Sequence, residues 1–147
     1  MKAITIKQPW ANLIVHDIKG IENRTWKTNY RGKVLVHAGA DEKLDKMPLD
    51  IVFTESQLNE LLKHFTENEL CKRTGLYGKI IGSVEIVDCV QNHPSIWAEK
   101  NVWNWVLANP IMFPKPIPAK GKLSFWEFPD WDSLKHSGMD TKLTNWE

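Results

Sequence analysis

Residues 6–26 read IKQPWANLIVHDIKGIENRTW. They join an apolar helix pattern to a cluster of charged residues, Lys19, Glu22 and Arg24. Trp10, Leu13 and Ile14 are spaced i, i+3 and i+4, so they share one face of a helix. The proline that precedes Trp10 suits a first helical turn. We therefore expect a helix over residues 9–18 whose apolar face packs against the core.

The end of this helix is marked by Asp17. Helices often end at a residue in the left-handed conformation. Asp tolerates that conformation less well than Gly but better than most other residues. We expect the chain to turn sharply at Asp17 and to continue as an extended segment over residues 20–26.

Two residues of the charged cluster, Glu22 and Arg24, lie in that extended segment, and Lys19 directly precedes it. Side chains alternate along a strand, so Glu22, Arg24 and Trp26 share one face, and Lys19 at the helix exit can reach over the same opening. A carboxylate beside an arginine holds the guanidinium as a fixed fork, which suits a phosphate or a base edge, and Trp10 or Trp26 can stack a base beside it. The alternative is an ion pair that only pins the corner, worth at most about 1 kcal/mol if exposed.

The rest of the chain is rich in strands. Thr54 and Gln57 form a capping box, with Phe53 and Leu58 as a hydrophobic staple, and predict a helix that runs to about Cys71. Strands are expected over residues 3–6, 33–39, 79–90, 101–109 and 123–128, with a bulge at Gly82. The proline-rich residues 110–122 are expected to form an edge strand or an irregular crossing. These elements predict an α+β protein whose mainly antiparallel sheet curls into a small barrel with flanking helices.

The composition is that of a globular domain. At 147 residues the chain is expected to form one domain over residues 1–130, followed by a tail over 131–147 that packs partly on it. Two cysteines and the lack of a long apolar run predict a cytoplasmic protein without a membrane segment. The histidines and acidic residues show no ligand spacing, so neither a metal nor a cofactor is expected. The oligomeric state stays open.

Charge and tryptophan are distributed unusually. Residues 1–33 carry seven basic residues and two acidic ones, although the whole chain has a net charge of only +1. Such an asymmetry can build one basic face, which Lys115, Lys120 and Lys122 can extend, and chance clustering on solvated strands is the alternative. Most of the eight tryptophans should be buried, but this number leaves one or two to stack bases on the surface.

The chain resembles the ASCH domain family, named for homology to the activating signal cointegrator. The resemblance covers roughly residues 3–130, including the central strand YGKIIGSVEIVDCV and the proline-rich NPIMFPKPIPAKGKLSFWEF. The family usually has glycine where this chain has Asp17. The matching residues near the N-terminus are Gln8, Pro9, Trp10, Ala11, Lys19, Ile21, Glu22, Arg24, Trp26, Arg31, Gly32, His37 and Ala38.

This resemblance implies a PUA-like barrel that binds RNA or another single-stranded nucleic acid. A nucleotide or base is then expected in a basic cleft around Lys19, Glu22 and Arg24. The residues expected to contact nucleic acid are Trp10, Lys19, Glu22, Arg24, Trp26, Tyr30 and Arg31.

The resemblance also implies an alternative function as a hydrolase. Some short ASCH-like proteins remove the acetyl group of N4-acetylcytidine with a lysine, a threonine three residues later and a distant glutamate, and others are ribonucleases. Lys19 matches the lysine, but Glu22 occupies the threonine position and Thr25 is out of register. If the chain is an enzyme, Lys19 and Glu22 are the expected catalytic residues, with Lys19 as base or nucleophile. A module that binds no nucleotide remains a third alternative.

Overall fold

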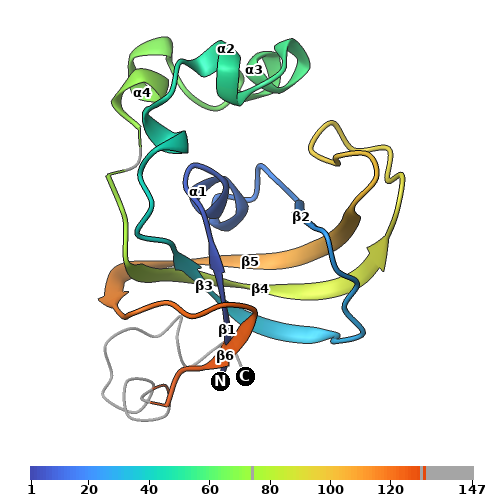
Figure 1. Cartoon of the computed structure of the whole chain (residues 1–147). Helices are drawn as coiled ribbons and strands as arrows, with labels where there is room; N and C mark the ends of the chain where they lie inside the picture. The colour runs from blue at the N-terminus through green and yellow to red at the C-terminus, as the bar shows by residue number, and fades with distance from the viewer. Residues whose placement is uncertain (74, 130, 132–147) are drawn as a thin grey trace.

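One curled sheet forms the body of the molecule (Figure 1). The computed structural model describes residues 1–73, 75–129 and 131. Within them, six strands are ordered β2-β5-β4-β3-β1-β6. Their bounds are β1 Lys2–Ile6, β2 Ile21–Arg24, β3 Gly32–Ala38, β4 Lys79–Val90, β5 Trp103–Pro118 and β6 Phe125–Glu127.

The pairing is mainly antiparallel, and only the β1–β3 pair is parallel among the described strands. Although β5, β4 and β3 separate β2 from β1 in the sheet, Arg24 of β2 donates a hydrogen bond to the carbonyl of Thr5 in β1. The sheet must therefore curl strongly to bring these strands together. This half-barrel with flanking helices confirms the predicted α+β, PUA-like fold class.

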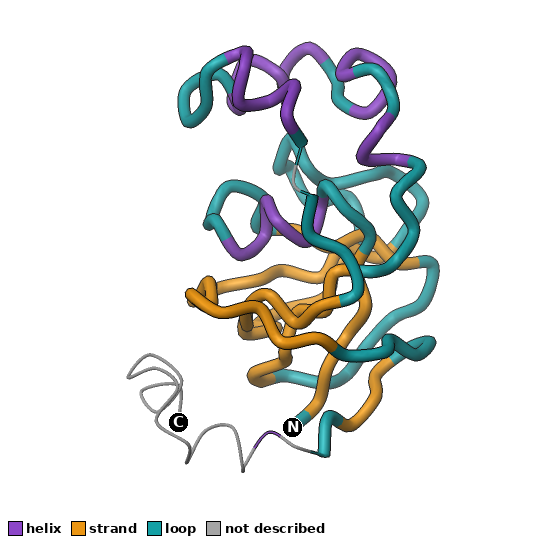
Figure 2. Tube along the Cα trace, turned by 90° about the vertical axis from the view of Figure 1, so that its left-hand side faces the viewer, coloured by secondary structure: helices purple, strands orange, loops and turns teal. Residues whose placement is uncertain are grey.

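Helices lie over the open side and at one end of the sheet. In Figures 1 and 2, α1 (Trp10–Val15) lies between the sheet and a group of short helices. That group comprises the 3₁₀ helix η1 Leu44–Lys46 and the α-helices α2 Leu49–Val52, α3 Glu55–Leu61 and α4 Glu67–Lys72. The first helix is shorter than predicted because it ends before Asp17, which has the expected left-handed backbone (φ 61°).

The predicted single helix from Thr54 to Cys71 is wrong. The capping box of Thr54 and Gln57 is present and begins α3, but that helix ends at Leu61. A second capping box, formed by Thr66 and Glu69, begins α4. A capping residue has a non-helical backbone, so Thr66 cannot lie inside a helix. The apolar pattern, which continues past Thr66 in the sequence, therefore does not mark one continuous helix.

The bulge predicted at Gly82 is confirmed. The pairing of β4 with both neighbours shifts register between Ile80 and Gly82. A Cβ atom on Gly82 would lie 2.2 Å from the carbonyl oxygen of Ile111 and 2.7 Å from Cγ1 of Val15. Glycine thus lets α1 approach the sheet closely at this point.

The proline-rich segment continues β5 as far as Pro118 instead of forming a separate element, so the prediction of an irregular crossing is wrong for residues 110–118. The edge-strand alternative is confirmed for one side of the strand, because β4 pairs along the other side. Strand β2 pairs with β5 only over Trp103–Val106. Beyond Val106 one side of β5 has no strand partner among the described residues, so prolines can lie there without removing a ladder hydrogen bond.

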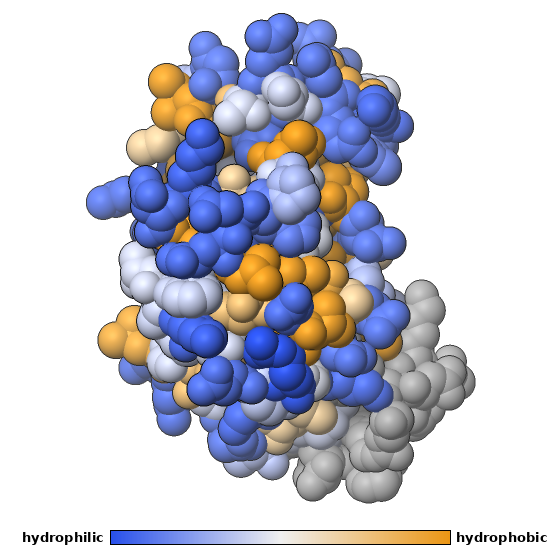
Figure 3. Space-filling model, turned by 90° about the vertical axis from the view of Figure 1, so that its right-hand side faces the viewer, coloured by the Kyte–Doolittle hydropathy of each residue, from blue (hydrophilic) through white to orange (hydrophobic). Residues whose placement is uncertain are grey.

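Figure 3 shows apolar side chains gathered in the middle of one face, surrounded by hydrophilic ones. No helix in the described part of the chain is long and apolar enough to cross a membrane. Trp131 is buried and stacks on Phe113, with ring centroids 6.0 Å apart. The rest of the tail, for which partial packing was predicted, lies outside the described residues.

Candidate functional site

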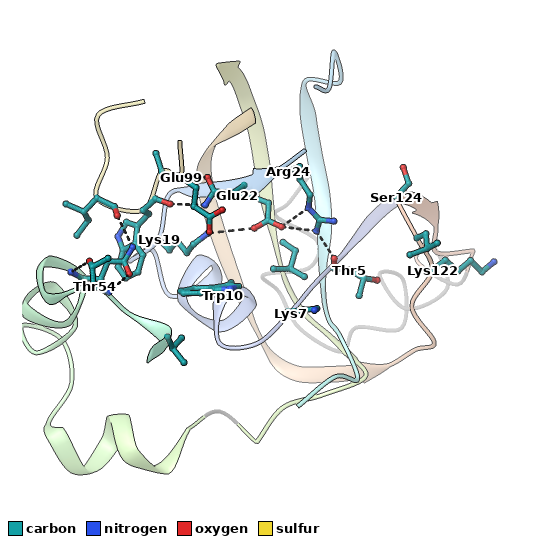
Figure 4. Close-up of a pocket in the computed structure, with 18 residues that line it drawn as sticks. Thr5, Lys7, Trp10, Lys19, Glu22, Arg24, Thr54, Glu99, Lys122 and Ser124 are labelled. Atoms are coloured by element: carbon teal, nitrogen blue, oxygen red, sulfur yellow. Dashed lines mark hydrogen bonds and ion pairs between the residues drawn. The ribbon is translucent and has the colours of Figure 1, made fainter. Parts of the chain in front are cut away.

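A pocket of about 590 Å³ opens between α1, β2 and two loops (Figure 4). Its volume is within the range of about 300–1,000 Å³ that small-molecule sites commonly have. The residues that line it are Thr5, Ile6, Lys7, Trp10, Lys19, Glu22, Asn23, Arg24, Val52, Thr54, Gln57, Ile96, Trp97, Ala98, Glu99, Lys122, Leu123 and Ser124.

The turn after α1 places Lys19 in this pocket. The backbone N–H groups of Ile18 and Lys19 both donate to the carbonyl of Leu13, at 3.0 and 3.1 Å. The left-handed backbone of Asp17 makes this tight return of the chain possible. As a result, the Lys19 side chain is only 3% exposed although it carries an ammonium group.

Lys19, Glu22 and Arg24 form one continuous ionic chain. Oε1 of Glu22 lies 3.7 Å from Nζ of Lys19, which also donates to the carbonyl of Ile21. Oε2 of Glu22 accepts from Nε of Arg24 at 2.8 Å and lies 2.8 Å from its Nη2. Both carboxylate oxygens of Glu22 are therefore held by cations, and Glu22 orients the two basic side chains on either side of it.

The surroundings of Lys19 act on its charge in opposite directions. Burial lowers the pKa of Lys19 and is the largest effect, while the carboxylates of Glu22 and Glu99 raise it and Arg24 lowers it further. The Lys19 ammonium also lies 5.4 Å from the centre of the Trp10 ring. This pocket thus contains an amine that is easier to deprotonate than an ordinary lysine.

An asparagine pair positions the loop after β4. The side-chain oxygen of Asn23 accepts from the backbone N–H of Glu99 at 3.0 Å and from the amide of Asn104 at 2.9 Å. The Asn23 amide in turn donates to the carbonyl of Trp97 at 2.9 Å. Asn104 is fully buried, so these bonds fix the loop to β2 and β5 and hold Glu99 beside the pocket.

Aromatic rings and the α3 capping box form the wall beside Trp10. Trp10 makes edge-to-face contacts with Phe53 and Trp97, at centroid distances of 5.4 and 6.5 Å. Gln57, besides capping α3, donates to the carbonyl of Ile96 at 2.9 Å. Through Gln57, the capping box therefore also connects the start of α3 to the loop after β4 that lines the pocket.

Four of the predicted site residues, Trp10, Lys19, Glu22 and Arg24, come together around this pocket. The other three, Trp26, Tyr30 and Arg31, lie elsewhere. Within the described residues, no group of three or more His, Cys, Asp or Glu side chains is arranged to hold a metal ion.

Trp26, Tyr30 and Arg31 have partners outside the pocket. Trp26 packs edge-to-face on Trp105, with centroids 4.8 Å apart. The Tyr30 hydroxyl donates to the carbonyl of Lys33, and Arg31 lies 3.8 Å from the Asp88 carboxylate on the surface. A contact between these three residues and nucleic acid stays a prediction, and it would involve a surface outside the pocket.

Several pocket residues carry no signal in the sequence, because only the folded chain brings them near Lys19. Glu99 and Ile96 come from the loop after β4, and Leu123 and Ser124 from the loop before β6. Their sequence neighbourhoods contain no motif that marks a site. Lys122 was expected to extend the basic face, and it lies on the rim of the pocket.

The sheet is a half-barrel with α1 over its open side, and a charged, aromatic pocket lies beside that helix. This arrangement defines the chain as a PUA-like domain. Residues 4–117 match the family model described as ASCH domain, and the chain belongs to this family. It is 28% identical, over 95% of its length, to activating signal cointegrator 1 of Homo sapiens and to that of Mus musculus. The chain spans only 24% of the length of these relatives.

Proposed function

We propose that this protein binds RNA or another single-stranded nucleic acid and holds one nucleotide in the pocket around Lys19, Glu22 and Arg24. The observation that carries the proposal is the largely buried ionic chain of these three residues beside the Trp10 ring, in a pocket of about 590 Å³. Membership of the ASCH family supports the same function.

The chemistry of the pocket fits a nucleotide. Four basic side chains and two acidic ones line it, so the pocket favours an anionic ligand. The carboxylates can accept hydrogen bonds from the amino group of a base, and an aromatic face that stacks a base contributes about 1–3 kcal/mol. The basic N-terminal third can follow the strand beyond the pocket.

The test is the binding of a short fluorescent single-stranded RNA, followed by anisotropy, to the wild type and to Lys19→Met. Lys63→Met is the matched control because Lys63 is an exposed lysine after α3 that pairs with Glu60 outside the pocket. We expect wild-type binding, a loss of at least tenfold in Lys19→Met and little change in Lys63→Met. A wild type that binds no RNA, or equal effects of both variants, would contradict the proposal.

A second candidate function is the hydrolysis of a modified nucleoside in the same pocket. It is favoured by the lowered pKa of the Lys19 amine, because a neutral amine can act as a general base. In such a reaction water adds to the acetyl carbonyl of N4-acetylcytidine, the C–N4 bond breaks, and N4 takes a proton, which leaves cytidine and acetate. Glu22 is held by Lys19 and Arg24, so its role in this reaction is to position Lys19.

Release of cytidine from N4-acetylcytidine by the purified wild type, measured by chromatography, tests this second candidate. Turnover that disappears in Lys19→Ala supports hydrolysis, whereas turnover that is absent, or equal in both proteins, excludes it. We also propose a cytoplasmic location, which the two free cysteines support and which imaging of a tagged protein tests.

A further inference from the structure

The pocket has two chemically different ends (Figure 4). The aromatic end comprises Trp10, Trp97 and the adjacent Glu99. The basic end comprises Arg24, Lys7 and Lys122. In Figure 4, Lys122 and Ser124 lie on the side opposite to Lys19 and Thr54, with Arg24 between them.

We propose that the pocket binds its nucleotide in one orientation, with the base at the aromatic end and a phosphate at the basic end. This inference rests on the proposed function and extends it, because it makes the phosphate a recognised part of the ligand. The pocket would then prefer a nucleotide, either free or within a strand, to a bare nucleoside.

The guanidinium of Arg24 supplies a directed donor at the basic end. Nε and Nη2 of Arg24 are bonded to Glu22 and to the carbonyl of Thr5. Nη1 makes no hydrogen bond within the described residues, and the Arg24 side chain is 22% exposed. The two bonds fix the plane of the guanidinium, so Nη1 is held ready to donate to an anion.

The two lysines add mobile charge at the same end. Lys7 has a 64% exposed side chain and lies 3.6 Å from the Asp41 carboxylate, which neutralises part of its charge. Lys122 is exposed and forms no ion pair with the described part of the chain. A phosphate that binds at this end gains a second and a third cation without the cost of burying them.

The aromatic end suits a base and disfavours a phosphate. Trp10 and Trp97 form an apolar wall, and the Glu99 carboxylate lies close enough to Lys19 to act on its charge. Two carboxylates, Glu22 and Glu99, act on the single ammonium of Lys19 at this end, so a phosphate there would meet an excess of like charge. The amino group of a base can instead donate to a carboxylate. The two ends therefore select opposite parts of one nucleotide.

The salt dependence of RNA binding tests this orientation in the whole chain. Neutralising a residue that contacts a phosphate reduces the slope of log K against log salt by roughly 0.7 for a single strand. We expect this reduction in Lys122→Gln and in Lys7→Gln, and no reduction in Lys63→Gln, an exposed lysine that pairs with Glu60 outside the pocket. Glu99→Gln, at the other end, should change the affinity but not reduce the slope.

A competition experiment adds an independent measurement. The competitors are cytidine, adenosine and their 5′-monophosphates. Each is added to labelled RNA bound to the wild type or to a Lys7→Gln, Lys122→Gln double variant, and the displaced RNA is measured. We expect the monophosphates to compete roughly tenfold better with the wild type and to lose this advantage in the double variant.

The outcomes separate this inference from the proposed function. The orientation alone would be overturned if the salt slopes are unchanged and nucleosides compete as well as monophosphates. In that case RNA would still bind to the wild type, and Lys19→Met would still weaken RNA binding. A wild type that binds no RNA and no nucleotide would overturn both.

Discussion

The Arg24 guanidinium donates a hydrogen bond to the Thr5 carbonyl at 2.7 Å and so joins β2 to β1 across the open side of the sheet. The same guanidinium holds Glu22, which in turn pairs with Lys19. Arg24 therefore belongs both to the closure of the half-barrel and to the pocket. A change at Arg24 should affect stability and ligand binding together.

Replacing Arg24 with Met should destabilise the protein by about 3 kcal/mol, because it removes a partner of the buried Glu22 carboxylate. The double variant Glu22→Gln, Arg24→Met should be more stable than the sum of the two single variants predicts, with a coupling of about 1–3 kcal/mol. Urea unfolding of the four proteins measures this coupling. Strictly additive effects would show that the two side chains do not act as a pair.

Lys19→Met should have a different effect, because Lys19 is a buried charge that costs free energy. Glu22 keeps Arg24 as its partner in this variant, so we expect stability at neutral pH to be unchanged or raised. Ligand binding should nevertheless be lost. A variant that is strongly destabilised yet binds RNA normally would identify Lys19 as a structural residue.

The pH dependence of stability checks the charge of Lys19. Its pKa in the folded protein is lowered from the ordinary value of 10.5, so between these two values the unfolded chain binds more protons. The free energy of unfolding of the wild type should therefore rise, relative to Lys19→Met, as the pH increases through this window toward 10.5. The reference variant cancels the other titrating groups. A difference that falls with pH would show that the pKa of Lys19 is raised instead.

Gly121→Ala should displace the loop that carries Lys122. A Cβ atom at Gly121 would lie 2.6 Å from Oγ1 of Thr5 and 2.7 Å from Cε1 of His37. His37 is buried and hydrogen-bonded to Thr5 and to the Ala119 carbonyl, so the ring cannot move aside easily. We expect a loss of about 1–3 kcal/mol and a weaker salt dependence of RNA binding.

Gly20→Ala is the control for stability, since a Cβ there would meet only the Leu107 carbonyl, at 3.9 Å. Thermal unfolding compares the two alanine variants. If Gly121→Ala is as stable as Gly20→Ala, the loop before β6 can rearrange freely, and Lys122 then has no fixed position at the basic end.

Leu123 is 95% exposed on the rim of the pocket, which is unusual for a large apolar side chain. If a nucleotide packs under it, Leu123→Ser should weaken RNA binding by several fold without changing the salt slope. Leu62→Ser is the matched control because Leu62 is also exposed, at 52%, but lies outside the pocket. Equal anisotropy curves for the two variants would show that Leu123 does not contact the ligand.

Local signals in the sequence were sufficient to predict those features of the fold that depend only on residues close together in the chain. The left-handed Asp17, the capping box of Thr54 and the bulge at Gly82 each follow from the chemistry of one or two residues. The length of the helix after Thr54 did not, because the apolar pattern continues through Thr66. The combination of Thr66 and Glu69 was a readable signal for a new helix start.

The pocket could be predicted only in part, for a physical reason. Lys19, Glu22 and Arg24 lie within one turn and strand, so backbone geometry alone brings them together. Glu99 and Lys122 reach the same pocket through the curl of the whole sheet, which no local pattern encodes. The number of tryptophans did not show which of them line the pocket. Trp26 packs against Trp105, whereas Trp10 lines the pocket.

The most direct test of nucleotide binding in the pocket is a backbone and indole NMR titration of the ¹⁵N-labelled protein with a short single-stranded RNA. We expect shifts at the Trp10 indole and at the amides of residues 19–24, 96–99 and 122–124, which surround the pocket. Shifts confined to the surface around Tyr30 and Arg31, or no shifts at saturating RNA, would contradict binding in the pocket.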